Sequence, residues 1–174
     1  MAWTRKLYRK VPRRHDGALK EYSISSKLKK EKKITDEFEI MLSSLTLEEI
    51  IALRDHLLYG GFLHTDDNYG LNQSFRREMK RVFPNKDFVE IPHYHKVFHS
   101  YYDMPNGLPK IHEHDGKPPQ LFGLFNGNRI MVLYSFESDL GDGWEDEEVH
   151  NNPKEIRLNA LQMGVNIVYF ALTQ

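Results

Sequence analysis

Three stretches of this chain carry carboxylate and imidazole side chains of the kind that bind metal ions or move protons. In the first, HTDDNYG, Asp66 and Asp67 stand in tandem and Tyr69 follows. A carboxylate where a strand ends could bind a cation, act as a general base or cap the next helix. Successive side chains of a strand point to opposite sides, so we expect only one aspartate to enter a given cleft directly. The alternative is that the pair only caps a turn.

The second stretch, KIHEHDG, places His112 and His114 two residues apart, on the same side of an extended segment. With Asp115 they are candidate ligands of Zn²⁺, Mn²⁺ or Fe²⁺. A third ligand at a diagnostic spacing is missing, so the alternative is a polar loop whose histidines bond to the backbone. Lys110 and Arg77 are candidates for neutralising the carboxylates or binding an anion.

The third stretch, DLGDGWED, brings Asp139, Asp142 and Glu145 together around two glycines. Glycine allows tight bends that let carboxylates converge, which suits a hard cation such as Ca²⁺ or Mg²⁺, although the spacing is not that of an EF-hand. Trp144 is a candidate stacking surface or lid anchor. The alternative is a solvated acidic loop with Trp144 in the core.

Helices and strands alternate around these stretches. Thr46 and Glu49 have capping-box spacing ahead of an apolar helical stripe that Gly60 and Gly61 end. In chain order we expect a helix over 46–58, a strand over 62–65, a helix from Asn72 or Ser74 to 82, a strand over 88–91 and a helical turn over 95–102. Strands over 121–125 and 129–135 follow, joined by an Asn-Gly-Asn hairpin. A last helix begins at Pro153, and its end, VNIVYFAL, also suits a strand.

This order predicts an α/β fold of three layers, with ligands bound beyond the carboxyl ends of the strands. Two long loops, 103–120 and 136–152, have no predicted helix or strand and are rich in ionisable groups. We expect both loops to fold over the strand end at Asp66. The three stretches would then share one cleft.

Charge divides the chain into a basic leader, residues 1–45, and an acidic α/β domain, residues 46–174. Residues 1–33 hold 12 Lys and Arg against 3 Asp and Glu, whereas residues 34–174 hold 12 against 22. The leader could bind an anionic polymer, a lipid surface or the acidic body, or it could simply be solvated. The body is too acidic for an obvious nucleic-acid groove.

Several classes are excluded by what the sequence lacks. It contains no cysteine, which excludes disulfides, thiolate metal sites and a catalytic thiol. It has no phosphate-binding glycine motif and no nucleophile elbow, so neither a nucleotide cofactor nor a serine nucleophile is indicated. A divalent metal is the one cofactor that the residues suggest. No signal peptide or long apolar run is present, and we expect a cytoplasmic protein.

The segments GGFLHTDDNYG, SFRREMKRVFP, HSYYDMPNGLPKIHEHDG, SDLGDGWED and ALQMGVNIVYFALT together resemble an uncharacterised bacterial family, domain of unknown function 4159. The resemblance covers residues 46–174. It implies a flavodoxin-like domain, similar to class I glutamine amidotransferases, often encoded near or fused to membrane-associated proteins of the aerotolerance type. No reaction comes with it.

Two departures from the family matter. Residues 1–45 do not resemble the β–α units with which members usually begin, so we expect a sheet that lacks N-terminal strands and has an open edge that invites self-association. Without a cysteine, glutamine hydrolysis by the amidotransferase route is excluded.

Two functions follow as hypotheses. One is a module that binds a small ligand or a partner in a membrane-associated complex. The other is a metal-dependent hydrolase in which His112, His114 and an aspartate hold the metal and Asp66 or Glu145 activates water.

Overall fold

The computed structural model of the chain describes residues 44–67, 70–113 and 116–174. The elements follow in the order α2 (Leu47–Leu58), β1 (Leu63–Asp66), α3 (Asn72–Val82), β2 (Val89–Glu90), the 3₁₀ helix η1 (Lys96–His99), β3 (Gln120–Asn126), β4 (Arg129–Phe136), α4 (Leu140–Trp144), α5 (Glu147–His150) and α6 (Lys154–Thr173). Most of the predicted leader, and Tyr69, His114 and Asp115 among the site candidates, lie outside the described residues.

The four strands form one mixed sheet in the order β1-β4-β3-β2. β1 runs parallel to β4, with Asp66 opposite Ser135, while β3 is antiparallel to both β4 and β2. The Asn-Gly-Asn hairpin is confirmed, and Gly127 in its turn has a φ of 59°. The prediction of a mixed helix and strand content is confirmed. The sheet contains both parallel and antiparallel pairs, because a tight hairpin forces its two strands to be antiparallel.

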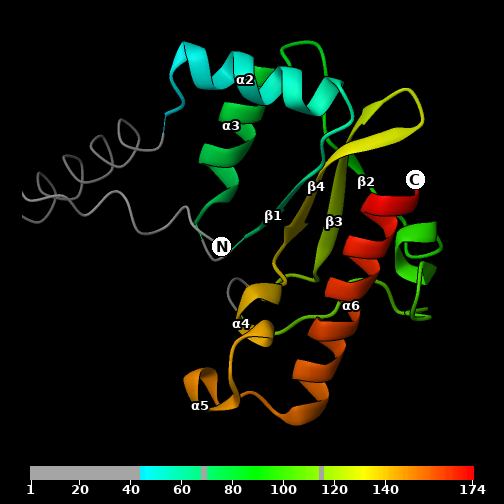
Figure 1. Cartoon of the computed structure of the whole chain (residues 1–174). Helices are drawn as coiled ribbons and strands as arrows, with labels where there is room; N and C mark the ends of the chain where they lie inside the picture. Colours follow the sequence, from blue (N-terminus) through cyan, green and yellow to red (C-terminus); the bar gives the residue numbers. More distant parts are fainter. Residues whose placement is uncertain (1–43, 68–69, 114–115) are drawn as a thin grey trace, which may run out of the picture. The chain divides into compact units, whose positions relative to one another are not determined.

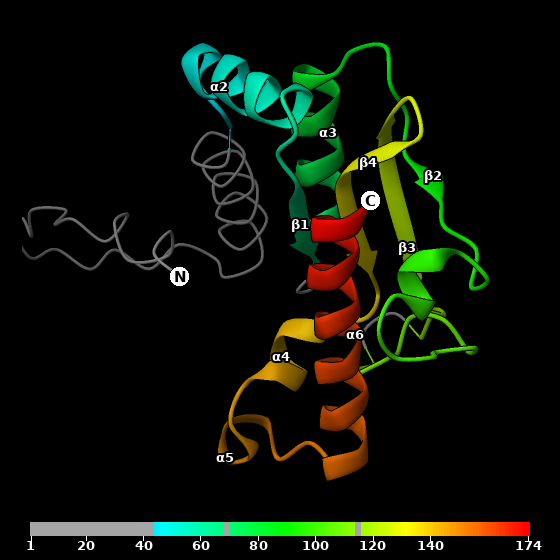
Figure 2. The same ribbon diagram turned by 45° about the vertical axis from the view of Figure 1, so that its right-hand side comes forward.

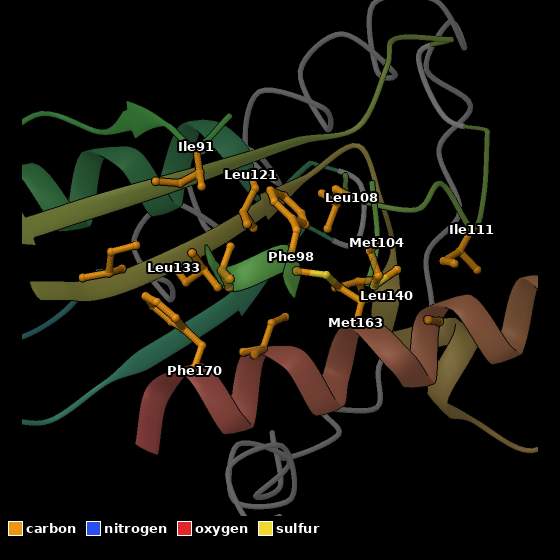
Figure 3. Close-up of a cluster of buried hydrophobic side chains, with 14 residues drawn as sticks. Ile91, Phe98, Met104, Leu108, Ile111, Leu121, Leu133, Leu140, Met163 and Phe170 are labelled. Atoms are coloured by element: carbon orange, nitrogen blue, oxygen red, sulfur yellow. The ribbon is translucent and has the colours of Figure 1, made fainter. Parts of the chain in front are cut away.

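Helices pack on both faces of this sheet (Figures 1 and 2). On one face, α2 and α3 bury an apolar cluster against β4 that includes Phe75, Met79 and Tyr134. On the other face, α6 and η1 build a second cluster, in which Phe170 and Met163 of α6 lie against side chains of η1 and the strands (Figure 3). β4 supplies both clusters: Ile130 and Leu133 lie in the cluster under α6, and Met131, Val132 and Tyr134 lie in the other. The alternation of a regular strand is interrupted at Met131 and Val132, where the pairing of β4 with β3 shifts register.

The signals that bound α2 act as the sequence predicts. The Glu49 N–H donates to Thr46 Oγ1 (3.2 Å), and the Thr46 N–H donates to Glu49 Oε2 (2.9 Å), which completes a capping box. After Tyr59 the chain turns at Gly60, whose φ of 110° favours glycine, and the Gly61 N–H returns to the His56 carbonyl (2.8 Å). The turn delivers the chain directly into β1.

The predicted cap of the second helix is wrong. Leu71, not Asn72 or Ser74, is the N-cap residue of α3, and its side chain makes no capping bond. Asn72 Oδ1 instead accepts from Arg76 Nε (2.7 Å). The Leu71 N–H is taken up by Asp67 Oδ1 (3.1 Å), so the aspartate ahead of the helix satisfies this turn.

Two further expectations need correction. The 136–152 loop contains two short helices, α4 and α5. α4 forms where Leu140 and Gly143 are buried against α6, whereas α5 buries no residue. The end of α6 is helical through Thr173, not a strand, since its buried residues recur every three or four positions. The 103–120 segment contains no helix or strand before Gln120 among its described residues, as expected.

Candidate metal centre

The site candidates meet where β1 and β4 end. Because these strands are parallel neighbours, their carboxyl ends open at the same edge, and α4 lies just beyond it (Figures 1 and 2). Asp66 joins the three elements: its Oδ1 accepts from the Ser135 hydroxyl, and its Oδ2 accepts from the Gly141 N–H (2.8 Å). Asp139, the N-cap residue of α4, makes no capping bond, so Asp66 supplies that cap from another strand.

Asp67 points to different partners from Asp66, as expected of adjacent strand residues. It is buried and accepts from the Leu71 N–H, while the Tyr134 hydroxyl near it donates to Asn72 Oδ1 (3.3 Å). Burial raises the pKa of the Asp67 carboxyl, and burial beside Asp67 raises the pKa of Tyr134. Asp67 therefore belongs to the turn that starts α3.

His112 is held beside two carboxylates of the third stretch. Its Nδ1 lies 2.9 Å from Asp142 Oδ2 and 3.2 Å from Asp139 Oδ2, and its Nε2 lies 3.0 Å from Asn152 Oδ1. The backbone secures this approach, because the Ile111 N–H donates to the Ser138 carbonyl (2.9 Å). His112 of the second stretch thus meets Asp139 and Asp142 of the third at one edge of the sheet.

His150 completes the group from the other side. Its Nδ1 lies 3.4 Å from Asp142 Oδ2, and its Nε2 lies 2.9 Å from Glu145 Oε2. The rings of His112 and His150 are 5.5 Å apart between centroids. One ligand atom from each of His112, Asp142 and His150 lies within 4.8 Å of the others. We call these three residues the His–Asp–His cluster.

The orientation of each imidazole is set by its outer nitrogen. The Asn152 side-chain oxygen lies 3.0 Å from His112 Nε2, and the Asn152 nitrogen lies 3.5 Å from the Asp142 carbonyl, so this oxygen is placed to accept a proton carried by Nε2. The Glu145 carboxylate is placed in the same way, 2.9 Å from His150 Nε2. In the neutral form of each ring the Nδ1 lone pair then faces Asp142, and only a proton or a metal ion between them makes that approach favourable.

The other candidates have structural partners. Lys110 pairs with the buried Glu137 (3.1 Å), and Arg77 donates to Glu78 on its own helix (2.9 Å). Trp144 donates from Nε1 to the Ala160 carbonyl (2.8 Å) and packs over Gly164, so it faces α6. Beside Asp66, His64 lies 3.2 Å from Ser135 Oγ, and burial lowers the pKa of its imidazole.

His150 and Asn152 are the residues that sequence reasoning missed. His150 is eight positions from Asp142 with no regular period, and Asn152 carries no signal of a metal site. Only the reversal of the chain between α4 and α6 brings both back to His112. Recognising that Asp142 and His150 form a pair requires knowledge of the fold.

The fold and cluster define a mixed α/β domain with a histidine–carboxylate group at the carboxyl ends of two parallel strands. Residues 41–172 match the family model described as Domain of unknown function (DUF4159), so this chain belongs to that family, for which no function is established. No curated protein matches it. In the part of the chain that the structure describes, no helix has both the length and the apolar character needed to cross a membrane.

Proposed function

We propose that this domain binds a divalent transition-metal ion of the Zn²⁺ type at the His–Asp–His cluster and, through that ion, a small ligand. The observation that carries the proposal is the orientation of the two imidazoles. Both direct Nδ1 at Asp142 while Asn152 and Glu145 hold their outer nitrogens. Oxygen acceptors on the outer nitrogen are the usual support of metal-ligating histidines.

The chemistry of the donors selects the class of metal. Two imidazole nitrogens and one carboxylate oxygen suit Zn²⁺ and its first-row neighbours, whereas Ca²⁺ and Mg²⁺ prefer an all-oxygen shell. Asp139 brings a second carboxylate within 3.2 Å of His112 and lies almost wholly out of water. A bound cation would offset the repulsion between these carboxylates.

Three protein ligands leave a coordination position for a ligand atom or a water molecule. This supports a binding module first and a hydrolase second. For hydrolysis a free base is needed, yet both residues expected to activate water are engaged: Asp66 accepts from Ser135 and Gly141, and Glu145 accepts from His150. The hydrolase alternative therefore rests on the open position alone.

Two broader proposals accompany this one. The parallel pair β1 and β4, with helices on both sheet faces, supports a flavodoxin-like ancestry for the fold, although β3 and β2 depart from a fully parallel sheet. A membrane-associated protein complex remains our proposal for the setting in which the domain works, on the family resemblance alone.

Calorimetric titration of the full chain with Zn²⁺, after removal of bound metal with a chelator, tests the metal site. We expect one ion per chain and a rise in melting temperature of about 10 °C at a hundredfold excess of Zn²⁺ over the dissociation constant. Affinity should fall as the pH is lowered, because a protonated imidazole cannot ligate. Ca²⁺ should bind far more weakly.

His112→Ala and His150→Ala should each weaken Zn²⁺ binding at least about 100-fold. The matched control is His99→Ala, since His99 also contacts an aspartate, Asp103 (2.5 Å), outside the cluster. Binding that is lost equally in the His99 variant, or retained in both cluster variants, would overturn the proposal.

A further inference from the structure

α6 carries an outward apolar stripe that lies exposed among the residues that the structure describes. Its buried face includes Ile167, and Met163 and Phe170 of the same face pack toward the sheet (Figure 3). On another side of the same helix the exposed apolar residues recur at alternating intervals of three and four, at Leu158, Leu161, Val165, Val168 and Leu172. We call these five residues the outer seam. They are 40% to 81% exposed, and their spacing is that of the a and d positions of a coiled coil.

α6 itself carries no charged side chain along the outer seam. Residues 158–174 include no Asp, Glu, Lys or Arg. Tyr101, Trp144 and Tyr169 border the seam and help form a groove of about 510 Å³. The exposed fractions of these three aromatic residues and of the seam correspond to about 800 Å² of accessible surface, which is close to one partner's share of a standard interface.

We propose that this protein forms a twofold homodimer in which the outer seam of α6 packs against the same seam of a second copy. A seam with coiled-coil spacing is matched by another helix with that spacing, and each copy supplies one. Depletion of charge at the core is typical of homodimer contacts.

Sedimentation velocity of the full chain tests the dimer directly. At about 50 µM we expect twice the 20.6 kDa chain mass, with dissociation below about 10 µM. Val168→Glu should weaken association at least about 100-fold, since two carboxylates would be buried across the axis. Leu47→Glu is the matched control, an equally apolar-to-acidic change at a 66% exposed position on α2, and it should leave the dimer intact.

Cross-linking decides which surface is used. The chain has no cysteine, so Val165→Cys, at the middle of the seam, introduces the one thiol and should give a disulfide-linked dimer on mild oxidation. Leu47→Cys should not. A monomer at 50 µM would overturn the proposal. A dimer that survives Val168→Glu without cross-linking at position 165, for example one joined through the β1 edge, would overturn it as well. Far-UV circular dichroism confirms that each variant is folded.

Discussion

Replacement of Asp66 tests whether one carboxylate builds the candidate metal centre without touching the metal. The side chain accepts from the Ser135 hydroxyl and from the Gly141 N–H, and thereby fixes α4 against the ends of β1 and β4. Asp66→Ala leaves both donors without this acceptor. At about 1–3 kcal/mol for each unsatisfied partly buried group, discounted for partial exposure, we expect a loss of about 2–4 kcal/mol in the free energy of unfolding.

Two variants of the same contact separate shape from charge. Asp66→Asn can still accept from Gly141 through its oxygen and donate to Ser135 through its nitrogen, so it should cost about 1 kcal/mol or less. Ser135→Ala removes a single partner and should cost about 1 kcal/mol. If Asp66→Ala proves too unstable to purify, these two variants still show how much each contact of Asp66 contributes to the free energy of unfolding.

Urea unfolding followed by circular dichroism gives the stability, and Zn²⁺ titration gives the affinity. Because α4 also carries Asp142, we expect Asp66→Ala to lower Zn²⁺ affinity by about 10-fold or more, and Asp66→Asn to lower it less. Wild-type stability and affinity in Asp66→Ala would refute the view that Asp66 positions α4. A loss of affinity with unchanged stability would instead indicate that Asp66 meets the ion itself.

Two further predictions concern packing and pH. A Cβ on Gly143 would lie 2.3 Å from the Cβ of Ala160, so Gly143→Ala should cost about 2–3 kcal/mol and weaken Zn²⁺ binding, whereas Gly141→Ala, with its nearest neighbour at 3.5 Å, should change the unfolding free energy little. Burial opposes ionisation of Glu78, but hydrogen bonds from Arg77, the Leu45 N–H and Arg81 outweigh it and lower the pKa of its carboxyl. Glu78 therefore stabilises the fold above the usual glutamate range and loses this effect as the pH falls through the lowered pKa. Glu78→Gln should cost about 1–2 kcal/mol at pH 7 and flatten the decline of stability toward pH 4 in urea titrations; an unchanged decline would contradict this.

Local sequence signals predicted the helices and strands well where one or two residues determine the backbone conformation. Thr46 with Glu49 marks a helix start, and Gly127 marks a hairpin, because the backbone conformations there admit few alternatives. The short helices α4 and α5 escaped prediction because single turns have little intrinsic stability, and α4 is fixed only by the packing of Leu140 and Gly143 in the fold.

The sequence indicated the edge of the sheet at which the acidic and histidine residues meet, but not all the residues that meet there. Parallel strand ends and acidic loops were enough to expect that Asp66, His112 and Asp142 would lie at one edge. The identity of the third cluster residue depends on the path from α4 through α5, which returns His150 to Asp142 after eight residues. Such a return depends on tertiary packing, for which a single sequence has no period or motif.

α4 is a single helical turn that carries two side chains with different partners. Asp142 faces the two histidines, and Trp144 donates to the Ala160 carbonyl beside the outer seam. Because both side chains stand on the same turn, a shift of its backbone moves both of them together. Occupancy of the cluster and association through α6 would therefore be thermodynamically linked, and each event would change the equilibrium constant of the other by the same factor.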